Sequence, residues 1–317
     1  MTNNIICLLV SQSPGTILGE NKHDVANLRK LHDKGNKYLP VHVNKLYSMC
    51  KKHLTGNFNF ICFADCTDGF HKDIILKPLP DYDKTYFNLY QRKRMIIEWP
   101  YLWLKLKLFE KGFLQGDCLF VDLDVIIHDN LDCVFEFEKG SLCFSVERGP
   151  LCYASNRHPE KFLKYNGGFF RFNSERHHFI WDIYSKNKDY IHTYYNLDDE
   201  AVTRMIRFGD KECFVFPTDW YFYYYERLII NESDKGKRLP VEKPHCVSYG
   251  NDDRGIHTFE TTPPPGSKFC HLNDPNVRID GREPDLFDLL IVPPKMTSVK
   301  CKDHYFLNNW NDFLKTS

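Results

Sequence analysis

The sequence predicts an α/β, Rossmann-like fold in which helices cover both faces of a mainly parallel sheet within a single domain. Apolar runs typical of buried strands alternate along the chain with helical segments, which is the order that parallel sheets require. The 317 residues, 42% of them hydrophobic, can bury one large core or two modest ones. Too little chain follows a late charged and proline-rich stretch to build a second core, so we expect one domain.

The first predicted elements are a strand, a helix and a second strand. The run IICLLV at residues 5–10 precedes a Ser/Pro/Gly segment, and many nucleotide-binding α/β domains begin in this way. Apolar side chains then recur at helical spacing through residues 41–54, with lysines on the outer face. The turn signal Thr-Gly-Asn leads into FNFICF at residues 58–63, which predicts the next strand.

The alternation continues to about residue 216. Helices are expected at residues 101–112, from about residue 175 and at 198–208, and strands at 118–122, 141–146, 167–172 and 213–216. The aromatic run DWYFYYYERL at residues 219–228 predicts a core strand, and the alternative is a surface that stacks on an acceptor sugar.

The predicted domain covers residues 1–280. Within it, residues 231–268 are rich in charged residues, glycine and proline, so we expect a long loop there. Residues 281–317 are expected to form a C-terminal extension that packs on the same domain.

Bulk composition narrows the range of partners. The 42 basic residues cancel the 42 acidic ones, so no net charge attracts the protein to nucleic acid or to an anionic membrane. No apolar stretch approaches the roughly 20 residues that span a bilayer. The 12 cysteines are scattered and the N-terminus lacks a secretory pattern, so we expect reduced thiols and a cytoplasmic protein.

Two aspartates interrupt the apolar run LFVDLDVII at the end of a predicted strand, where α/β sheets bind ligands. An unpaired buried carboxylate costs several kcal/mol, so Asp122 and Asp124 need a cation or a proton. One chemistry that fits is a Mg²⁺ or Mn²⁺ site completed by substrate phosphates. Another is phosphoryl transfer with Asp122 as the nucleophile, as in haloacid-dehalogenase-like phosphatases.

Residues 101–135 resemble the Asp-x-Asp core of GT-A-fold glycosyltransferases, especially glycogenin-type (retaining) enzymes and related bacterial transferases. Three further segments match in family order: YNGGFFRFN at 165–173, DDEAV at 198–202 and FCHLNDPNVR at 269–278. The resemblance implies a GT-A-like domain. It also implies a metal-dependent, hexosyltransferase-like enzyme that moves sugar from a nucleotide-diphosphate sugar, expected to be a UDP-sugar, to a glycan or other hydroxyl acceptor.

The resemblance also implies the metal site. Asp122 and Asp124 match the family's metal-binding pair, which binds Mn²⁺ or Mg²⁺ and through it the donor diphosphate. His271 matches the histidine that is the third ligand, and the alternative is a satisfied core histidine.

The donor-binding and catalytic residues implied by the resemblance lie on three segments. Lys105 matches the family lysine near the donor, although a lysine snorkelling from an amphipathic helix gives the same pattern. Asn166, Gly167 and Gly168 match the strand that approaches the donor sugar, although the glycines could instead mark a turn entering a strand. Asp199 matches the carboxylate near the sugar.

Two of these assignments carry complications. The helix-start position equally suits an N-cap or first-turn acid, and the sequence does not separate Asp199 from Asp198. After its histidine the family has a glycine and then Lys-Pro, whereas this chain has HLNDPNVR. Arg278 is the nearest cation, and a guanidinium is suited to take over the phosphate contact.

Two alternatives to a glycosyltransferase remain open at this point. Phosphatases of the kind named above usually carry their aspartates on the first strand, followed by a threonine turn, whereas here about half of the domain precedes Asp122. A catalytically inactive domain that binds nucleotide sugars is the other alternative, because the residues after His271 depart from the family pattern.

Overall fold

The computed structural model describes part of the chain. The described residues are 2–10, 38–81, 100–146, 165–195, 198–209, 211–223, 246–251, 257–261, 263–271, 289–291 and 299–303. Arg278 lies outside them.

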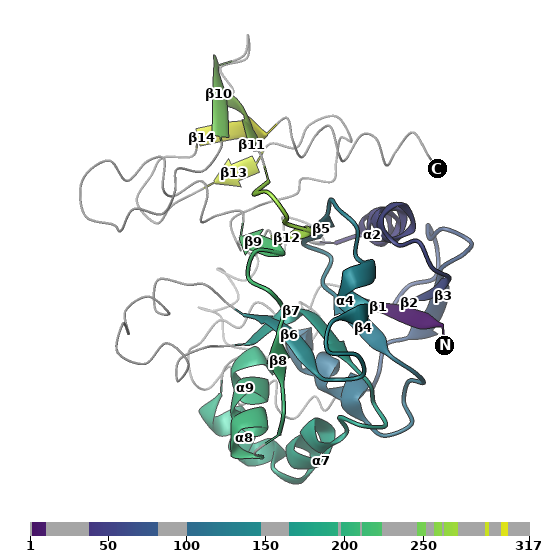
Figure 1. The fold of residues 1–317 in the computed structure, drawn as a ribbon. Helices are drawn as coiled ribbons and strands as arrows, with labels where there is room; N and C mark the ends of the chain where they lie inside the picture. Colours follow the sequence, from purple (N-terminus) through teal and green to yellow (C-terminus); the bar gives the residue numbers. More distant parts are fainter. Residues whose placement is uncertain are drawn as a thin grey trace, which may run out of the picture.

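The centre of the fold is a seven-stranded sheet in the order β3-β2-β1-β4-β7-β6-β8 (Figure 1). The strands β3, β2, β1 and β4 run parallel, and so do β6 and β8, whereas β7 is antiparallel to both of its neighbours. The sheet is therefore mainly parallel, as predicted. Its strands are β1 Asn3–Leu9, β2 Phe58–Ala64, β3 Ile75–Pro78, β4 Cys118–Val121, β6 Cys143–Val146, β7 Tyr165–Phe172 and β8 Phe214–Val215.

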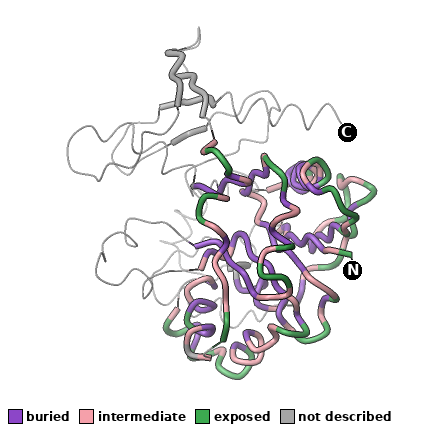
Figure 2. The backbone as a smooth tube through the Cα atoms, in the orientation of Figure 1, coloured by how far each residue is buried: buried purple, intermediate pink, exposed green. Residues whose placement is uncertain are grey.

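Helices lie on both faces of this sheet. They are α2 Pro40–His53, the 3₁₀ helix η2 Pro100–Phe109, α4 Asp132–Glu136, α7 Phe179–Lys186, α8 Lys188–Tyr194 and α9 Asp198–Phe208. Alternate β1 residues face opposite sides, so Ile5 packs in the cluster that contains α2 and α4, and Ile6 in the cluster that contains η2, α7 and α9. Figure 2 shows the buried strands between these layers.

The segment at residues 100–109 differs from the predicted helix, because it is a 3₁₀ helix. Its leucines recur at every second residue, a spacing that gives an α-helix no single apolar face. Trp103, Leu104 and Leu106 are all buried, so the segment is enclosed by the core rather than laid on it. None of the helices in the described part of the chain is long and apolar enough to cross a membrane.

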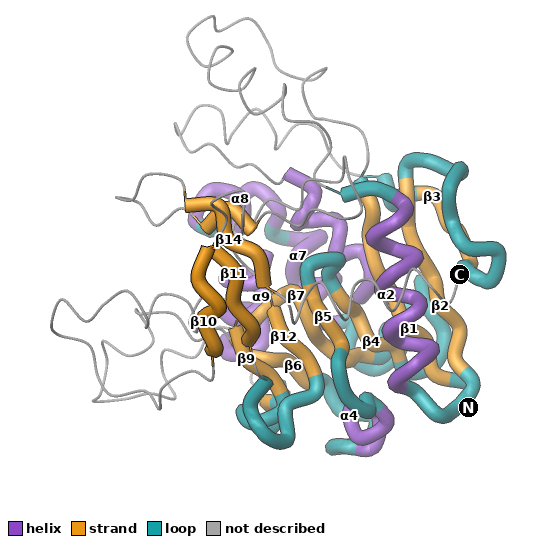
Figure 3. Tube along the Cα trace, turned by 90° about the horizontal axis from the view of Figure 1, so that it is seen from above, coloured by secondary structure: helices purple, strands orange, loops and turns teal. Residues whose placement is uncertain are grey.

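A three-stranded sheet lies next to β4, in the order β5-β12-β9 (Figure 3). Its strands are β5 Val125–Ile127, β12 Phe269–His271 and β9 Tyr221–Tyr223. Tyr221 and Phe222 are almost fully buried, which confirms the core-strand prediction for these two aromatic residues and excludes a sugar-stacking role for them.

A four-stranded sheet contains the rest of the described C-terminal part, in the order β10-β11-β14-β13. The strands β10 Cys246–Asn251 and β11 His257–Thr261 lie within residues 231–268, so the prediction of one continuous loop there is wrong. The strands β13 Leu289–Ile291 and β14 Val299–Asp303 belong to the extension, and β14 pairs with β11. The division at residue 280 stays a prediction.

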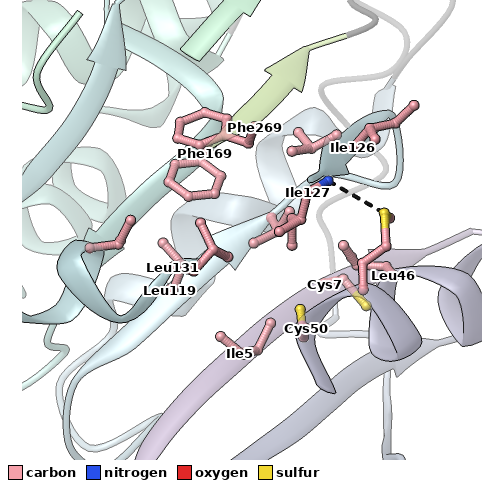
Figure 4. Close-up of a cluster of buried hydrophobic side chains, with 14 of the residues drawn as sticks. Ile5, Cys7, Leu46, Cys50, Leu119, Ile126, Ile127, Leu131, Phe169 and Phe269 are labelled. Atoms are coloured by element: carbon pink, nitrogen blue, oxygen red, sulfur yellow. Dashed lines mark hydrogen bonds between the residues drawn. The ribbon is translucent and has the colours of Figure 1, made fainter. Parts of the chain in front are cut away.

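The core under α2 joins the two sheets (Figure 4). The rings of Phe169 on β7 and Phe269 on β12 stack with their centroids 3.8 Å apart. On the other side, the backbone N–H of Ile127 donates to Met49 Sδ at 3.3 Å, which ties β5 to α2. These contacts fix β5 and β12 against the end of β4.

Arg171, on β7, is a buried cation whose two terminal nitrogens donate to backbone carbonyls. Its side chain is 1% exposed, and its guanidinium donates to the carbonyls of Val134 at 2.6 Å and Phe135 at 3.0 Å, and to the carbonyl of Glu138. Arg171 thereby holds α4 and the turn after it against the sheet.

Arg171→Met should lower the free energy of unfolding by about 3 kcal/mol or more, because it leaves several carbonyls without donors, two of them on buried residues. The matched control is Arg176→Met, since exposed Arg176 also donates to a carbonyl of this turn, that of Gly140 at 3.3 Å. Urea unfolding should show a loss below about 1 kcal/mol for the control. Equal losses in the two variants would contradict the role of Arg171.

Candidate functional site

Strand pairing brings three distant segments together at the carboxyl end of β4. The backbone N–H of Asp122 donates to the carbonyl of Gly168 at 2.8 Å, which continues the β4–β7 pairing by one residue. The strand β12 runs antiparallel to β5, and its register sets His271 opposite Val125, the residue after Asp124. The predicted metal ligands therefore lie around one edge of the large sheet.

Lys105 meets the first aspartate of the pair. Its Nζ donates to Asp122 Oδ2 at 2.7 Å and to the carbonyl of Gly167 at 3.0 Å, and it lies 5.1 Å from the centroid of the Phe120 ring. Burial opposes the ammonium form, but Asp122 and Asp198 outweigh it and raise the pKa of Lys105. The buried ammonium excludes the alternative of a snorkelling lysine.

His271 is 2% exposed and ends β12. Burial is the largest effect on its ring and lowers its pKa to about 4, against the opposing charge of Asp124. The imidazole is therefore neutral near pH 7, which is the form that coordinates metal ions. Its Nε2 lies 3.3 Å from the hydroxyl oxygen of Ser145.

Gly167 and Gly168 bring the backbone of β7 against the charged groups. A methyl group built at Gly168 would lie 2.8 Å from Asn166 Oδ1, 3.2 Å from Asp122 Oδ2 and 3.5 Å from His271 Nδ1. At Gly167 it would lie 3.0 Å from Asp198 Oδ2. Both glycines lie inside β7, so the alternative of a turn that enters the strand is wrong.

The side chain of Asn166 forms a hydrogen bond within its own strand, β7. Its side chain is 5% exposed, and its Oδ1 accepts the backbone N–H of Gly168 at 2.7 Å. This bond holds the amide beside Asp122 and His271, because all three side chains surround the position of the missing Gly168 side chain.

The structure separates the two aspartates that begin α9. Asp198 is 4% exposed, and burial raises its pKa to about 7 despite the nearby charge of Lys105. Asp199 is less buried, and its carboxylate accepts the backbone N–H of Glu200 at 2.7 Å, as expected of a first-turn acid. Asp198 is thus the residue that contributes its charge to the Lys105 centre.

The start of α9 is tied to β7 through Thr203. The Thr203 hydroxyl donates to the carbonyl of Asp199 at 2.7 Å and accepts the backbone N–H of Tyr165 at 3.0 Å. This relay fixes the first turn of α9 beside the glycines of β7.

Two residues near the site were not predicted from the sequence. Tyr38 precedes α2, and burial together with the charges of Asp124 and Asp122 raises the pKa of its phenol. Ser145 lies in the buried strand β6. No local pattern distinguishes either residue, because one is a single tyrosine before Leu-Pro and the other is a single serine in an apolar run.

The donor set suits a divalent cation, with two carboxylates and a neutral imidazole around one edge of the sheet. Within the described ranges, however, no three His, Cys, Asp or Glu side chains are arranged so that they could hold a metal ion. Asp122 is instead neutralised by Lys105. Coordination by all three predicted ligands therefore requires side-chain rearrangement.

Comparison with known proteins gives a fold and no family. No protein-family model matches the chain, and no curated protein matches its sequence. Solved structures do match, including the galactosyltransferase LgtC in complex with donor and acceptor sugar analogs and an active-site mutant of LgtC. Each has a TM-score of 0.51 and 12% identity, and each match covers 99% of this chain and 95% of that chain.

At this low identity the likeness shows the fold alone. It confirms the predicted GT-A-like α/β fold of the chain. It does not single out the glycogenin-type enzymes.

Gly168→Ala should destabilise the protein by at least about 1 kcal/mol, because the added methyl meets the polar atoms of Asn166, Asp122 and His271. The control is Gly56→Ala, since no atom lies within 4 Å of a methyl group at that position. Urea unfolding should show a change within about 0.5 kcal/mol for the control. If Gly168→Ala were equally tolerated, β7 would not need its glycine there.

Asp198→Asn should change how stability depends on pH. The folded-state pKa of about 7 exceeds the ordinary value of 3.8, so the folded protein holds an extra proton between these values. Wild-type stability, relative to the variant, should therefore fall as pH rises from about 4 to about 7 and level off above that. Urea unfolding at several pH values measures this difference, and parallel stability curves would contradict it.

Proposed function

We propose that this protein is a metal-dependent glycosyltransferase that moves a hexose from a nucleotide-diphosphate sugar to a glycan or other hydroxyl acceptor. A UDP-sugar is the proposed donor. The observation that carries the proposal is the placement of Asp122, Asp124 and a buried His271 on neighbouring segments around the carboxyl end of β4. The fold shared with a galactosyltransferase supports it.

Asp122, Asp124 and His271 are the residues that would hold Mn²⁺, or Mg²⁺. When bound, the ion would neutralise the charge that develops on the departing nucleotide diphosphate. A ligand set with an imidazole nitrogen favours Mn²⁺ over Mg²⁺. Arg278 is retained as the proposed diphosphate contact from the following segment.

Lys105 would hold the Asp122 carboxylate in position from the buried side of the site. The Lys105 side chain is almost fully buried, and its ammonium donates a hydrogen bond to one carboxylate oxygen of Asp122, whose side chain is 31% exposed. The ammonium also adds a fixed positive charge where an anionic donor would approach.

The residues Asn166, Gly167 and Gly168 would line the donor sugar, because a strand without side chains at two positions leaves its backbone open to close approach. Asp199 is the proposed catalytic carboxylate. Asp198, buried beside Lys105 and Gly167, is a second candidate for contact with the sugar.

The phosphatase alternative is disfavoured by the position of the aspartates, because Asp122 follows β4, whereas such phosphatases usually carry the pair on their first strand. A phosphorylated enzyme trapped at Asp122 would nevertheless establish that chemistry. Binding of nucleotide sugar without turnover would establish the inactive binding domain.

The direct test is incubation of the pure protein with Mn²⁺ and a panel of nucleotide sugars, with products identified by mass spectrometry. We expect hydrolysis or transfer that stops in excess chelator. Asp124→Asn should reduce turnover by about 100-fold or more, because it removes a metal ligand. The control is Asp129→Asn, a nearby aspartate that pairs with Lys268 at 2.8 Å, and it should retain activity. Undiminished turnover in chelator would contradict metal dependence.

A further inference from the structure

Ser145 lies beside the Nε2 atom of His271, whereas the Nδ1 atom lies nearer Asp122. It is fully buried on β6, and its hydroxyl donates to the carbonyl of Phe169 at 3.2 Å. The same hydroxyl oxygen lies 3.3 Å from His271 Nε2. Ser145 therefore links the backbone of β7 to the ring of the proposed ligand.

A break in strand pairing places this serine. The register of β6 against β7 shifts between Phe144 and Ser145, so that Ser145 pairs with Asn166. Such bulges redirect side chains and are frequent beside functional sites. Here the shift turns the Ser145 hydroxyl toward the carbonyl of Phe169.

The hydrogen count links the Ser145 hydroxyl to the tautomer of the imidazole. A hydroxyl has one hydrogen, and the carbonyl of Phe169 can only accept, so a Ser145 hydrogen directed at Phe169 leaves only the lone pairs of its oxygen for His271. In that arrangement the Ser145 oxygen accepts from Nε2, and the proton of the neutral ring is on Nε2. The lone pair of the ring is consequently on Nδ1.

Nδ1 lies on the side of the ring nearer Asp122. The position of a Gly168 methyl group would be 3.5 Å from His271 Nδ1 and 3.2 Å from Asp122 Oδ2, so both atoms border the same small volume. Three aromatic rings contact the imidazole nearly edge to face, those of Phe169 at 88°, Phe269 at 76° and Tyr221 at 89°. These rings restrict the tilt of the imidazole.

We propose that Ser145 is a positioning residue that holds His271 in the Nε2-protonated form and so presents Nδ1 to the metal. The inference deepens the proposed function and rests on it for the metal. The arrangement of the ring itself is independent of any metal. Partners of this kind behind a histidine ligand fix its tautomer and orientation, and their loss typically costs 10- to 100-fold in metal affinity.

The first experiment reads the tautomer without metal. Protein labelled with ¹⁵N-histidine, compared with the His271→Asn variant, identifies the His271 signals in a long-range ¹H–¹⁵N spectrum. We expect a protonated Nε2 and an unprotonated Nδ1 at neutral pH. A protonated Nδ1 in the wild type would overturn the inference, whatever the protein proves to bind.

The second experiment measures Mn²⁺ affinity by calorimetry in the presence of nucleoside diphosphate. Ser145→Ala should bind about 10- to 100-fold more weakly, since Nε2–H loses its acceptor, and Ser145→Thr should restore binding because it keeps the hydroxyl. The matched control is Ser174→Ala, a second fully buried serine whose hydroxyl donates to the carbonyl of Leu114, and it should bind like the wild type.

The outcomes separate the two proposals. Wild-type affinity in Ser145→Ala would overturn the positioning role and leave the proposed function standing. A wild-type protein that binds no Mn²⁺ would overturn the metal-dependent function and the metal role of Ser145. If Ser145→Ala fails to fold, the tautomer of the wild-type ring decides the inference.

Discussion

The organisation of the acidic edge depends on the ion pair between Lys105 and Asp122. Two carboxylates that follow a buried strand need a compensating cation. Lys105, on the 3₁₀ helix η2, supplies this cation through its ion pair with Asp122. The same ammonium takes the carbonyl of Gly167, so it also fixes β7 relative to β4. The glycines of β7 then become necessary, because the space beside the pair is filled by polar atoms.

The sequence was sufficient to predict the strands and helices that depend on local residue patterns. The first strands are short apolar runs bounded by turn residues, and they fall within a residue or two of their predicted limits. A helix was predicted at residues 101–112, but its 3₁₀ type was not, because burial of most of its side chains removes the one-sided pattern of an amphipathic α-helix. The sheet β5-β12-β9 was missed as a unit, since its three short strands are far apart in the chain and pair only through tertiary contacts.

The candidate site shows the same difference between features with a local cause in the sequence and features that depend on tertiary contacts. Asp122, Lys105 and the glycines stood out in the sequence because they interrupt apolar patterns or match a family order, and the structure places them side by side. The choice between Asp198 and Asp199 could not be predicted, because it depends on which carboxylate the first turn of α9 directs inward. Ser145 could not be predicted either, because its role comes from a register shift on β6 and a carbonyl on β7.

The position of β12 has a consequence for synthesis of the protein. This strand pairs with β5 on one side and β9 on the other, and it comes from residues 269–271, which are synthesised after both of them. Until then both flanking strands present unpaired edges, which are sites for association with other chains. The acidic edge also lacks its histidine until that moment. A nascent chain can therefore pair most of the strands of its large sheet before His271 joins the acidic edge.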